Sequence, residues 1–290
     1  MKRTRRGSQM GAAAAWALAS AALLVASPCL ASTEPPSVEQ PGLPDGVKSP
    51  PADPRSLYRI RPWADGLIIG ISALAAGVPF LFMDELIEPR CPCDPAEVSG
   101  LDRFAIGNDD VLTDQLSNVA VGTALVVPLA VNALVLDDRH LWLEDAVVFL
   151  ETVLVTGALT TSAKFLVQRP EPRAYRPARP AFVSRPKSYL SFFSGHTALT
   201  FAALTATTFT AGMRHGMWVL PAWVTFGMGS GVAATMVFSG RHFASDVFVG
   251  AVVGSVVGIA VPWMHLRQRS FRFLPTIGAK SAGLALVRRF

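Results

Sequence analysis

The sequence has little charge. Only 16% of its 290 residues are charged, whereas 51% are hydrophobic. An ordinary soluble domain needs a larger polar fraction than this to remain in water. The composition therefore favours a protein whose natural solvent is a lipid bilayer.

Cysteine is also scarce, with three residues in the whole chain. Cys91 and Cys93 lie in a polar loop with one residue between them, and a metal site there would need further ligands that the nearby sequence does not offer. The pair can be oxidised if the loop is exported, and two free thiols are the alternative. Cys29 is near the place of a lipoprotein anchor, but Pro28 before it does not match the small residue of such a site.

The chain lacks the interleaved basic and aromatic residues that are typical of nucleic-acid binding. Its net charge is +5, but the basic residues fall mainly between apolar runs and in a basic C-terminal tail, residues 267–290. We therefore expect no nucleic-acid partner. The alternation near Gly283 to Val287 is compatible with a strand.

The amino-terminal 62 residues have two parts. Residues 1–31 combine a basic start, an apolar stretch from Ala12 to Ala26 and small residues near Ala31, which predicts a secretory signal peptide. An uncleaved anchor helix is the alternative. Residues 32–62 are rich in proline and polar residues, which predicts a linker.

Residues 63–266 contain six apolar runs, at 66 to 83, 115 to 136, 146 to 163, 197 to 213, 217 to 238 and 247 to 265. Each run has roughly the 20 residues that a helix needs to cross a bilayer. The pattern predicts an all-α, six-helix transmembrane bundle in a bacterial cell envelope, in the inner membrane. A soluble helical bundle is the alternative.

Two features within the runs bear on packing. Gly250, Gly254 and Gly258 recur every four residues, so they share one helix face that we expect to pack closely against another helix. Glu151 is an ionisable residue inside the third run, where we expect it to be paired within the bundle rather than catalytic. Basic residues follow this run and favour the cytoplasmic side, but a phosphate site is basic on either side, so the orientation stays open.

Three polar stretches lie at the ends of the runs. They are Lys164 to Pro172 at the end of the third run, Ser191 to Thr197 at the start of the fourth, and Gly240 to Asp246 between the fifth and sixth. Antiparallel neighbours in a bundle alternate in direction, so these three ends lie on the same side and can converge.

The first two stretches carry groups that suit an oxyanion. Gly195 and His196 begin a helix whose free amides and positive dipole end attract negative charge. Ser194 can cap this helix or donate a hydrogen bond, and Lys164 supplies a positive charge. Phosphate is therefore the expected ligand.

The third stretch carries a candidate nucleophile. His242 and Asp246 are four residues apart, so on a helix they share one face and the carboxylate can hold one imidazole nitrogen. The other nitrogen is then available to attack phosphorus. His196 is available to protonate the leaving alcohol oxygen.

These residues resemble the three-part signature of the type 2 phosphatidic acid phosphatase and vanadium haloperoxidase superfamily. The resemblance covers about residues 110 to 265, and Ser-Gly-His and Gly-Arg-His-Phe-Ala-Ser-Asp are its most specific parts. It implies a phosphohydrolase without metal or cofactor, in which His242 becomes phosphorylated, Asp246 orients it and His196 is the general acid. It also implies phosphate binding by Lys164, Ser194 and Gly195.

Two positions depart from the signature. Glu171 and Met236 stand where the family has arginines, and Phe193 replaces the usual proline before Ser-Gly-His. An arginine grips phosphate through two charge-assisted hydrogen bonds that neither residue can replace. Compensation could come from three nearby arginines: Arg169, Arg173 and Arg241.

The sequence leads to two hypotheses. The first is a membrane phosphatase acting on a lipid phosphate such as phosphatidate, an isoprenyl diphosphate or a lipid A precursor. The second is a catalytically impaired member of the same fold that binds phosphorylated lipid or serves as a scaffold. Glu171 and Met236 are the features that discriminate between them, and restoring arginine at both places is expected to raise turnover.

Overall fold

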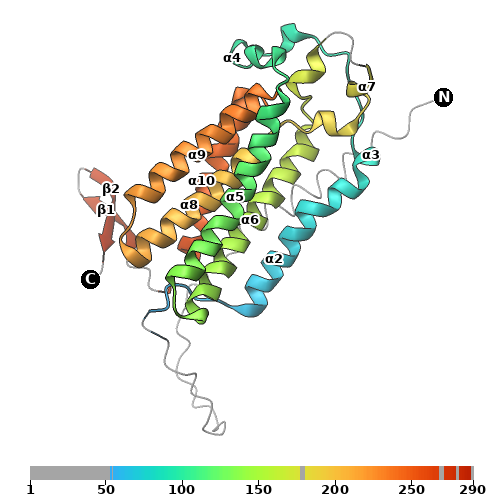
Figure 1. Cartoon of the computed structure of the whole chain (residues 1–290). Helices are drawn as coiled ribbons and strands as arrows, with labels where there is room; N and C mark the ends of the chain where they lie inside the picture. The colour runs from blue at the N-terminus through green and yellow to red at the C-terminus, as the bar shows by residue number, and fades with distance from the viewer. Residues whose placement is uncertain (1–52, 54, 177–179, 268–270, 279–280, 289–290) are drawn as a thin grey trace, which may run out of the picture.

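The computed structural model describes residues 53, 55–176, 180–267, 271–278 and 281–288 (Figure 1). The predicted signal peptide and most of the predicted linker lie outside the described residues. Six long helices make up the described bundle: α2 (Pro62–Gly77), α5 (Val111–Val135), α6 (Arg139–Val167), α8 (Gly195–His215), α9 (Val219–Phe238) and α10 (Ala244–His265).

The ends of the long helices follow from local sequence. Asp110 caps α5 by accepting hydrogen bonds from the amides of Leu112 and Thr113, and Asp138 caps α6 in the same way. At the other end, α6 stops where Gln168 adopts a left-handed conformation with φ of 48°, and α8 stops at Gly216 with φ of 68°.

Short helical turns cover the end of the bundle that carries the polar stretches, as Figure 1 shows for α3, α4 and α7. In chain order they are η1 (Val78–Phe82), α3 (Met83–Leu86), η2 (Pro95–Glu97), α4 (Gly100–Arg103), η3 (Phe104–Gly107), η4 (Pro172–Tyr175), α7 (Pro180–Val183) and η5 (Pro186–Tyr189). A disulfide joins Cys91 to Cys93 among them, which decides between the oxidised pair and the two free thiols.

Five helical segments of the described chain are long and apolar enough to cross a membrane: Pro62–Leu86, Val111–Val135, Arg139–Tyr175, Val219–Phe238 and Ala244–His265. Large apolar side chains on them point outward, for example Leu81 at 77% and Leu134 at 85% exposure. Such surfaces suit lipid rather than water. The described helices therefore form a membrane-spanning bundle.

The predicted count of six spans is not confirmed, because α8 is not among these five. This helix contacts α5, α6, α9 and α10, so little of it needs to face lipid. It carries threonines in place of large apolar residues, and the hydroxyls of Thr200, Thr207 and Thr208 bond to the preceding turn of their own helix.

The three glycines of α10 face α8, as their spacing predicts. A Cβ added at Gly250 would lie 2.7 Å from the carbonyl oxygen of Ser194, and one at Gly258 would lie 2.7 Å from that of Ala202. A Cβ at Gly254 would overlap the carbonyl group of Ala198. This close approach fixes the start of α10 against the start of α8.

Two parts of the chain lie outside the helical bundle. The tail forms an antiparallel hairpin, β1 (Phe271–Gly278) and β2 (Ser281–Arg288), with Phe271 opposite Arg288. The strand indicated by the alternation near Gly283 to Val287 is therefore present, and α-helices do not account for the whole fold. The end of the predicted linker packs against the bundle. Tyr58 is fully buried, and its hydroxyl lies 2.7 Å from that of Thr210. Its backbone forms an isolated antiparallel β-bridge with Leu266. The aromatic ring contributes apolar burial that the surrounding prolines and polar residues cannot.

Candidate functional site

The three polar stretches meet at one end of the bundle, where α6 ends and α8 and α10 begin (Figure 1). The backbone amide of Ser194 donates to the carbonyl oxygen of Asp246 over 3.1 Å. The hydroxyl of Ser191 donates to the carboxylate of Asp246 over 2.6 Å, and its backbone amide donates to the carbonyl oxygen of Arg169 over 3.0 Å. The amine of Lys164 donates to the carbonyl oxygen of the neighbouring Leu190. The first and third stretches are therefore each bonded to the second.

The start of α8 carries the expected oxyanion groups. Ser194 is the N-cap, is fully buried and accepts hydrogen bonds from the amide and hydroxyl of Thr197. A Cβ added at Gly195 would lie 3.8 Å from Cε of Lys164, so the lysine side chain passes beside the first residue of the helix. An ammonium group has three hydrogens, so its bond to the protein leaves donors for an anion.

His242 lies beside Asp246, as predicted, but in the turn before α10 rather than on one face of that helix, because α10 begins at Ala244 with Phe243 as its N-cap. Nδ1 of His242 lies 3.8 Å from Oδ2 of Asp246, a distance for an ion pair but too long for a hydrogen bond. Asp246 is held by Ser191 and by the amide of Phe243, which donates over 3.0 Å. Burial lowers the pKa of His242 to about 4, so its imidazole is neutral at pH 7, the form a nucleophile requires.

His196 is held by a residue that the sequence patterns do not identify. Its Nε2 lies 2.8 Å from the amide oxygen of Asn118 on α5. Burial, followed by the charges of Arg241 and Lys164, lowers the pKa of His196 to about 4. The charge of His196 also contributes to lowering the pKa of His242, so the two imidazoles interact across the same site. A polar residue within the second apolar run was the available signal for Asn118.

Two of the three arginines suggested as phosphate ligands, Arg169 and Arg241, are bonded to carboxylates at the helix ends. Arg169 donates to Asp246 over 2.5 Å and to Asp102 over 2.9 Å, and its guanidinium lies 4.0 Å from the ring centre of Phe243. Arg241 donates to Asp114 over 2.6 Å. In this arrangement each guanidinium holds the site together.

Asp102 is a second residue that the patterns do not identify. It lies in α4, and its carboxylate accepts from the amide and hydroxyl of Ser245 as well as from Arg169. The bonds to Ser245 and Arg169 outweigh burial and lower the pKa of Asp102, which is therefore charged at pH 7. Nothing in the spacing of the loop sequence marks this aspartate.

The two departures from the signature have different surroundings. Glu171 is buried, and its carboxylate accepts from Arg173 over 2.7 Å. Met236 is fully buried in an apolar cluster with Val98, Val121 and Phe243. A guanidinium in place of Met236 would therefore enter an apolar core, which argues against the expected gain from arginine at both places.

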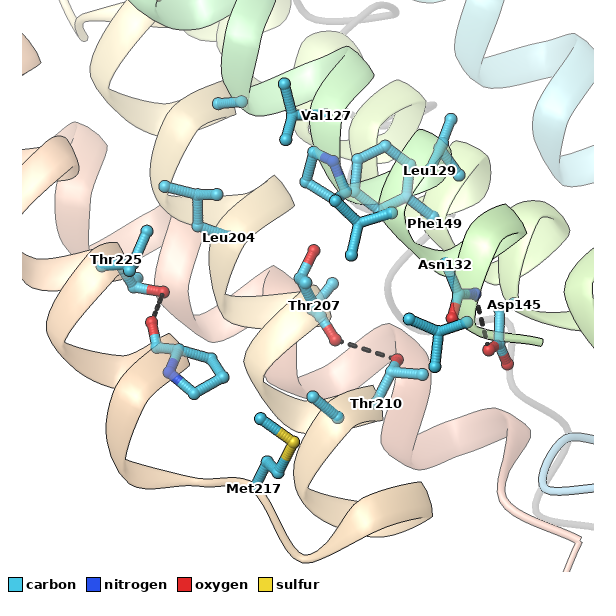
Figure 2. A pocket seen from close by; sticks show the side chains of 18 of the residues that line it. Val127, Leu129, Asn132, Asp145, Phe149, Leu204, Thr207, Thr210, Met217 and Thr225 are labelled. Atoms are coloured by element: carbon cyan, nitrogen blue, oxygen red, sulfur yellow. Dashed lines mark hydrogen bonds between the residues drawn. The ribbon is translucent and has the colours of Figure 1, made fainter.

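A separate apolar cavity of about 590 Å³ lies between α5, α6, α8 and α9 (Figure 2). Leu204, Val127 and Phe149 line it, together with Asn132 and Asp145 at its polar edge. On α8 its lining begins at Leu204, roughly 13 Å along the helix from Gly195. The cavity thus lies deeper in the bundle than the polar site, along the same two helices that hold His196 and Asn118.

The fold and the site together define a helical membrane protein with a buried, histidine-containing site suited to an oxyanion. Comparison with protein families matches residues 145–270 to the PAP2 superfamily. The predicted resemblance to the type 2 phosphatidic acid phosphatase superfamily is thereby confirmed over these residues. No curated protein matches the chain.

Two solved structures are similar to the chain. One is LpxE from Aquifex aeolicus, which is 22% identical, covers 57% of this chain and 96% of its own, and has a TM-score of 0.41. The other is the first transmembrane PAP2 type phosphatidylglycerolphosphate phosphatase from Bacillus subtilis, which is 15% identical, covers 69% of this chain and 93% of its own, and has a TM-score of 0.42. Both TM-scores are below 0.5, so the geometry of the site is inferred from the residues of this chain alone and not from these two structures.

Proposed function

We propose that the protein is a membrane phosphatase that hydrolyses a lipid phosphate or diphosphate through a phosphohistidine, without a catalytic metal. The observation that carries the proposal is the convergence of Lys164, the capped start of α8 and two neutral imidazoles at one end of the bundle. An ammonium group and free helix amides stabilise the charge of a phosphoryl group during transfer.

The first chemical step assigns one role to each histidine. Because Nδ1 of His242 faces Asp246, Nε2 is the nitrogen that attacks phosphorus. The nitrogen–phosphorus bond forms as the bond between phosphorus and the leaving oxygen breaks. His196 gives its proton to that oxygen; a phosphate dianion in the site supplies the negative charge that raises its pKa from about 4 and allows it to carry this proton.

In the second step water replaces the enzyme nitrogen. His196, now neutral, takes a proton from the water, whose oxygen attacks phosphorus. The nitrogen–phosphorus bond breaks, inorganic phosphate leaves, and His242 returns to its neutral form. Asp246, fixed by Ser191 and Arg169, keeps the His242 ring in one orientation through both steps.

The surroundings of the site favour a lipid substrate. The site lies at the end of a membrane-spanning bundle, which is the level of lipid head groups. The apolar cavity between α5 and α8 begins within reach of a lipid chain whose phosphate lies at His196 (Figure 2). The solved LpxE and phosphatidylglycerolphosphate phosphatase structures named above support the same substrate class.

A direct test uses the full chain purified in detergent with EDTA present. Phosphate release from dioleoyl phosphatidate and from an isoprenyl diphosphate is expected, together with inhibition by vanadate. His242→Ala should lose the activity by at least about a thousandfold, whereas the exposed His140→Ala serves as the control. Folded protein that releases no phosphate from either lipid would contradict the proposal.

The role of His196 can be separated from that of His242. The leaving group of an aryl phosphate is a stable phenolate, which does not need a proton from the enzyme. In a single-turnover measurement of the first step, His196→Asn should therefore retain far more activity on an aryl phosphate than on phosphatidate, whereas His242→Ala should lose both. Equal losses on the two substrates would contradict the general-acid role.

The second candidate function is binding of a lipid phosphate without turnover. It is favoured by the ion pairs that occupy Arg169 and Arg241 and by the carboxylate of Glu171 within the site. Vanadate or lipid phosphate binding by wild-type protein that shows no hydrolysis would identify this function.

A further inference from the structure

A second polar cluster lies inside the bundle, away from the phosphatase motifs. Asp65 of α2, Glu151 of α6 and His265 of α10 are 5%, 2% and 9% exposed. One candidate ligand atom from each side chain lies within 4.8 Å of the other two. The pairing expected for Glu151 within the bundle is therefore present, and three helices contribute to it.

The orientation of His265 is fixed by the backbone. Its Nδ1 lies 2.8 Å from the carbonyl oxygen of Val261, and a carbonyl oxygen only accepts, so Nδ1 carries the hydrogen. In the neutral ring the lone pair of Nε2 then faces Asp65 and Glu151, each at 3.5 Å. This is the orientation that a backbone partner gives to metal-binding histidines.

The two carboxylates have too few partners for their burial. Among the residues that the structure describes, Oε2 of Glu151 is buried without a hydrogen-bond partner. Oδ1 of Asp65 lies 3.5 Å from Nε2 of His265, which is too long for a good hydrogen bond. Oδ2 of Asp65 accepts from the backbone amide of Arg61 over 2.7 Å. Within the described part of the chain, His265 is the one ion-pair partner of either acid. With both acids charged, a site of this kind is strongly unfavourable unless a cation or a proton joins it.

The distances fit one small cation. Zinc binds nitrogen and carboxylate oxygen at about 2.0–2.1 Å in a tetrahedral arrangement, which places its ligand atoms about 3.4 Å apart. Nε2 of His265 lies 3.5 Å from the facing oxygens of both Asp65 and Glu151. A small rotation of the two carboxylates would bring their facing oxygens, which lie within 4.8 Å of each other, to the same spacing.

We propose that Asp65, Glu151 and His265 bind a divalent transition-metal ion of the zinc class, which ties α2, α6 and α10 together. Imidazole nitrogen with two carboxylates selects such ions over magnesium and calcium, which prefer oxygen alone. Lys164 lies about 20 Å further along α6 by the helical rise, so this ion is a structural element separate from the phosphate site. Asp65 in the first turn of α2 and His265 at the end of α10 place it close to the aqueous end of the bundle.

The test is metal binding by the full chain in detergent. After EDTA treatment and removal of the chelator, dialysis against Zn²⁺ should give about one bound zinc per chain, with a rise in the thermal midpoint. Glu151→Gln should weaken zinc binding by about 100-fold or more, since loss of even an indirect ligand contact costs 10–100-fold. His140→Gln, an exposed histidine on the same helix, is the matched control and should bind as wild type.

Three results would overturn the proposal. They are wild-type protein that takes up no zinc, zinc uptake that is equal in the Glu151→Gln variant, and magnesium that displaces zinc at equal concentration. X-ray absorption of the wild-type complex decides the ligands even if a variant misfolds: a nitrogen and oxygen shell with imidazole supports the site, and sulfur at the metal contradicts it. None of these readouts depends on phosphatase activity.

Discussion

Nε2 of His196 lies 2.8 Å from the amide oxygen of Asn118, which joins the first turn of α8 to α5. An amide oxygen only accepts, so the contact assigns the hydrogen of the neutral ring to Nε2 and leaves Nδ1 for the substrate. Asn118 is thus a positioning residue for the proposed acid.

Asn118→Ala is expected to lower kcat/KM for a lipid phosphate by about 10- to 100-fold, part of the 10²–10⁴ that a general acid contributes. Asn118→Asp should instead shift the pH profile, because a carboxylate raises the pKa of His196. Steady-state rates from pH 4 to 9 give both results. The control is Thr113→Ala, because the hydroxyl of Thr113 donates to the backbone carbonyl oxygen of Asp110. An unchanged pH profile in Asn118→Asp would contradict the positioning role of Asn118.

Glu171→Gln should strengthen the binding of anions. The carboxylate is buried in the site and repels phosphate, and removing about 1 kcal/mol of repulsion corresponds to roughly fivefold tighter binding. The inhibition constant of vanadate measures this directly. Glu171→Asp keeps the charge and should not show the gain; weaker vanadate binding in Glu171→Gln would mean that Glu171 acts mainly by holding Arg173.

Met236→Arg should destabilise the protein rather than restore a phosphate ligand. The side chain is fully buried among apolar residues, and an unpaired buried charge costs about 3–5 kcal/mol. The thermal midpoint in detergent should fall well below that of wild type. Met236→Leu is the control of similar volume, and a stable Met236→Arg protein with higher turnover would place the side chain in the site after all.

Gly254→Ala tests the packing of α10 on α8. The added methyl group would overlap the carbonyl group of Ala198, so the helices must separate, at a cost of about 1–3 kcal/mol for overpacking. Gly231→Ala on α9 has nothing within 4 Å and is the matched control, expected to be neutral or stabilising. Thermal midpoints and phosphate release measured together should fall only in the α10 variant, and equal midpoints would refute the close contact.

The stability of the protein should depend on the two site histidines below neutral pH. Both have a pKa of about 4 in the fold, against an ordinary value of 6.5. Between these values the unfolded chain binds more protons, so the free energy of unfolding falls as the pH drops from about 6.5 to about 4. In His242→Asn this dependence should be weaker than in wild type, and an equally steep dependence in that variant would contradict the contribution of His242.

The convergence of the three polar stretches could be predicted because helix direction alone decides it. The caps at Asp110, Asp138 and Ser194 and the glycine face of α10 are also local patterns. Such patterns show where a helix begins and which face is small or apolar. The four-residue spacing of His242 and Asp246 likewise predicts that the two side chains are neighbours, although His242 itself lies just before α10.

The partners of these residues could not be predicted in the same way. Asp102 reaches Arg169 from the short helix α4, and Asn118 reaches His196 from α5, because packing brings together segments far apart in the sequence. Met236 was assigned from motif spacing alone, which does not say whether its side chain faces a polar site or the apolar core. Tyr58 was placed in a linker by the composition around it, whereas a single buried ring decides its position.

The bridge between Tyr58 and Leu266 places the entry and exit of the helical domain side by side, just beyond the last residue of α10, whereas His242 and His196 lie at the starts of α10 and α8. A fluorescent protein or surface tether fused just before residue 55 or just after Leu266 would therefore lie at the membrane face opposite to the two histidines. Protein immobilised through either junction would keep the end that carries His196 and His242 directed away from the support.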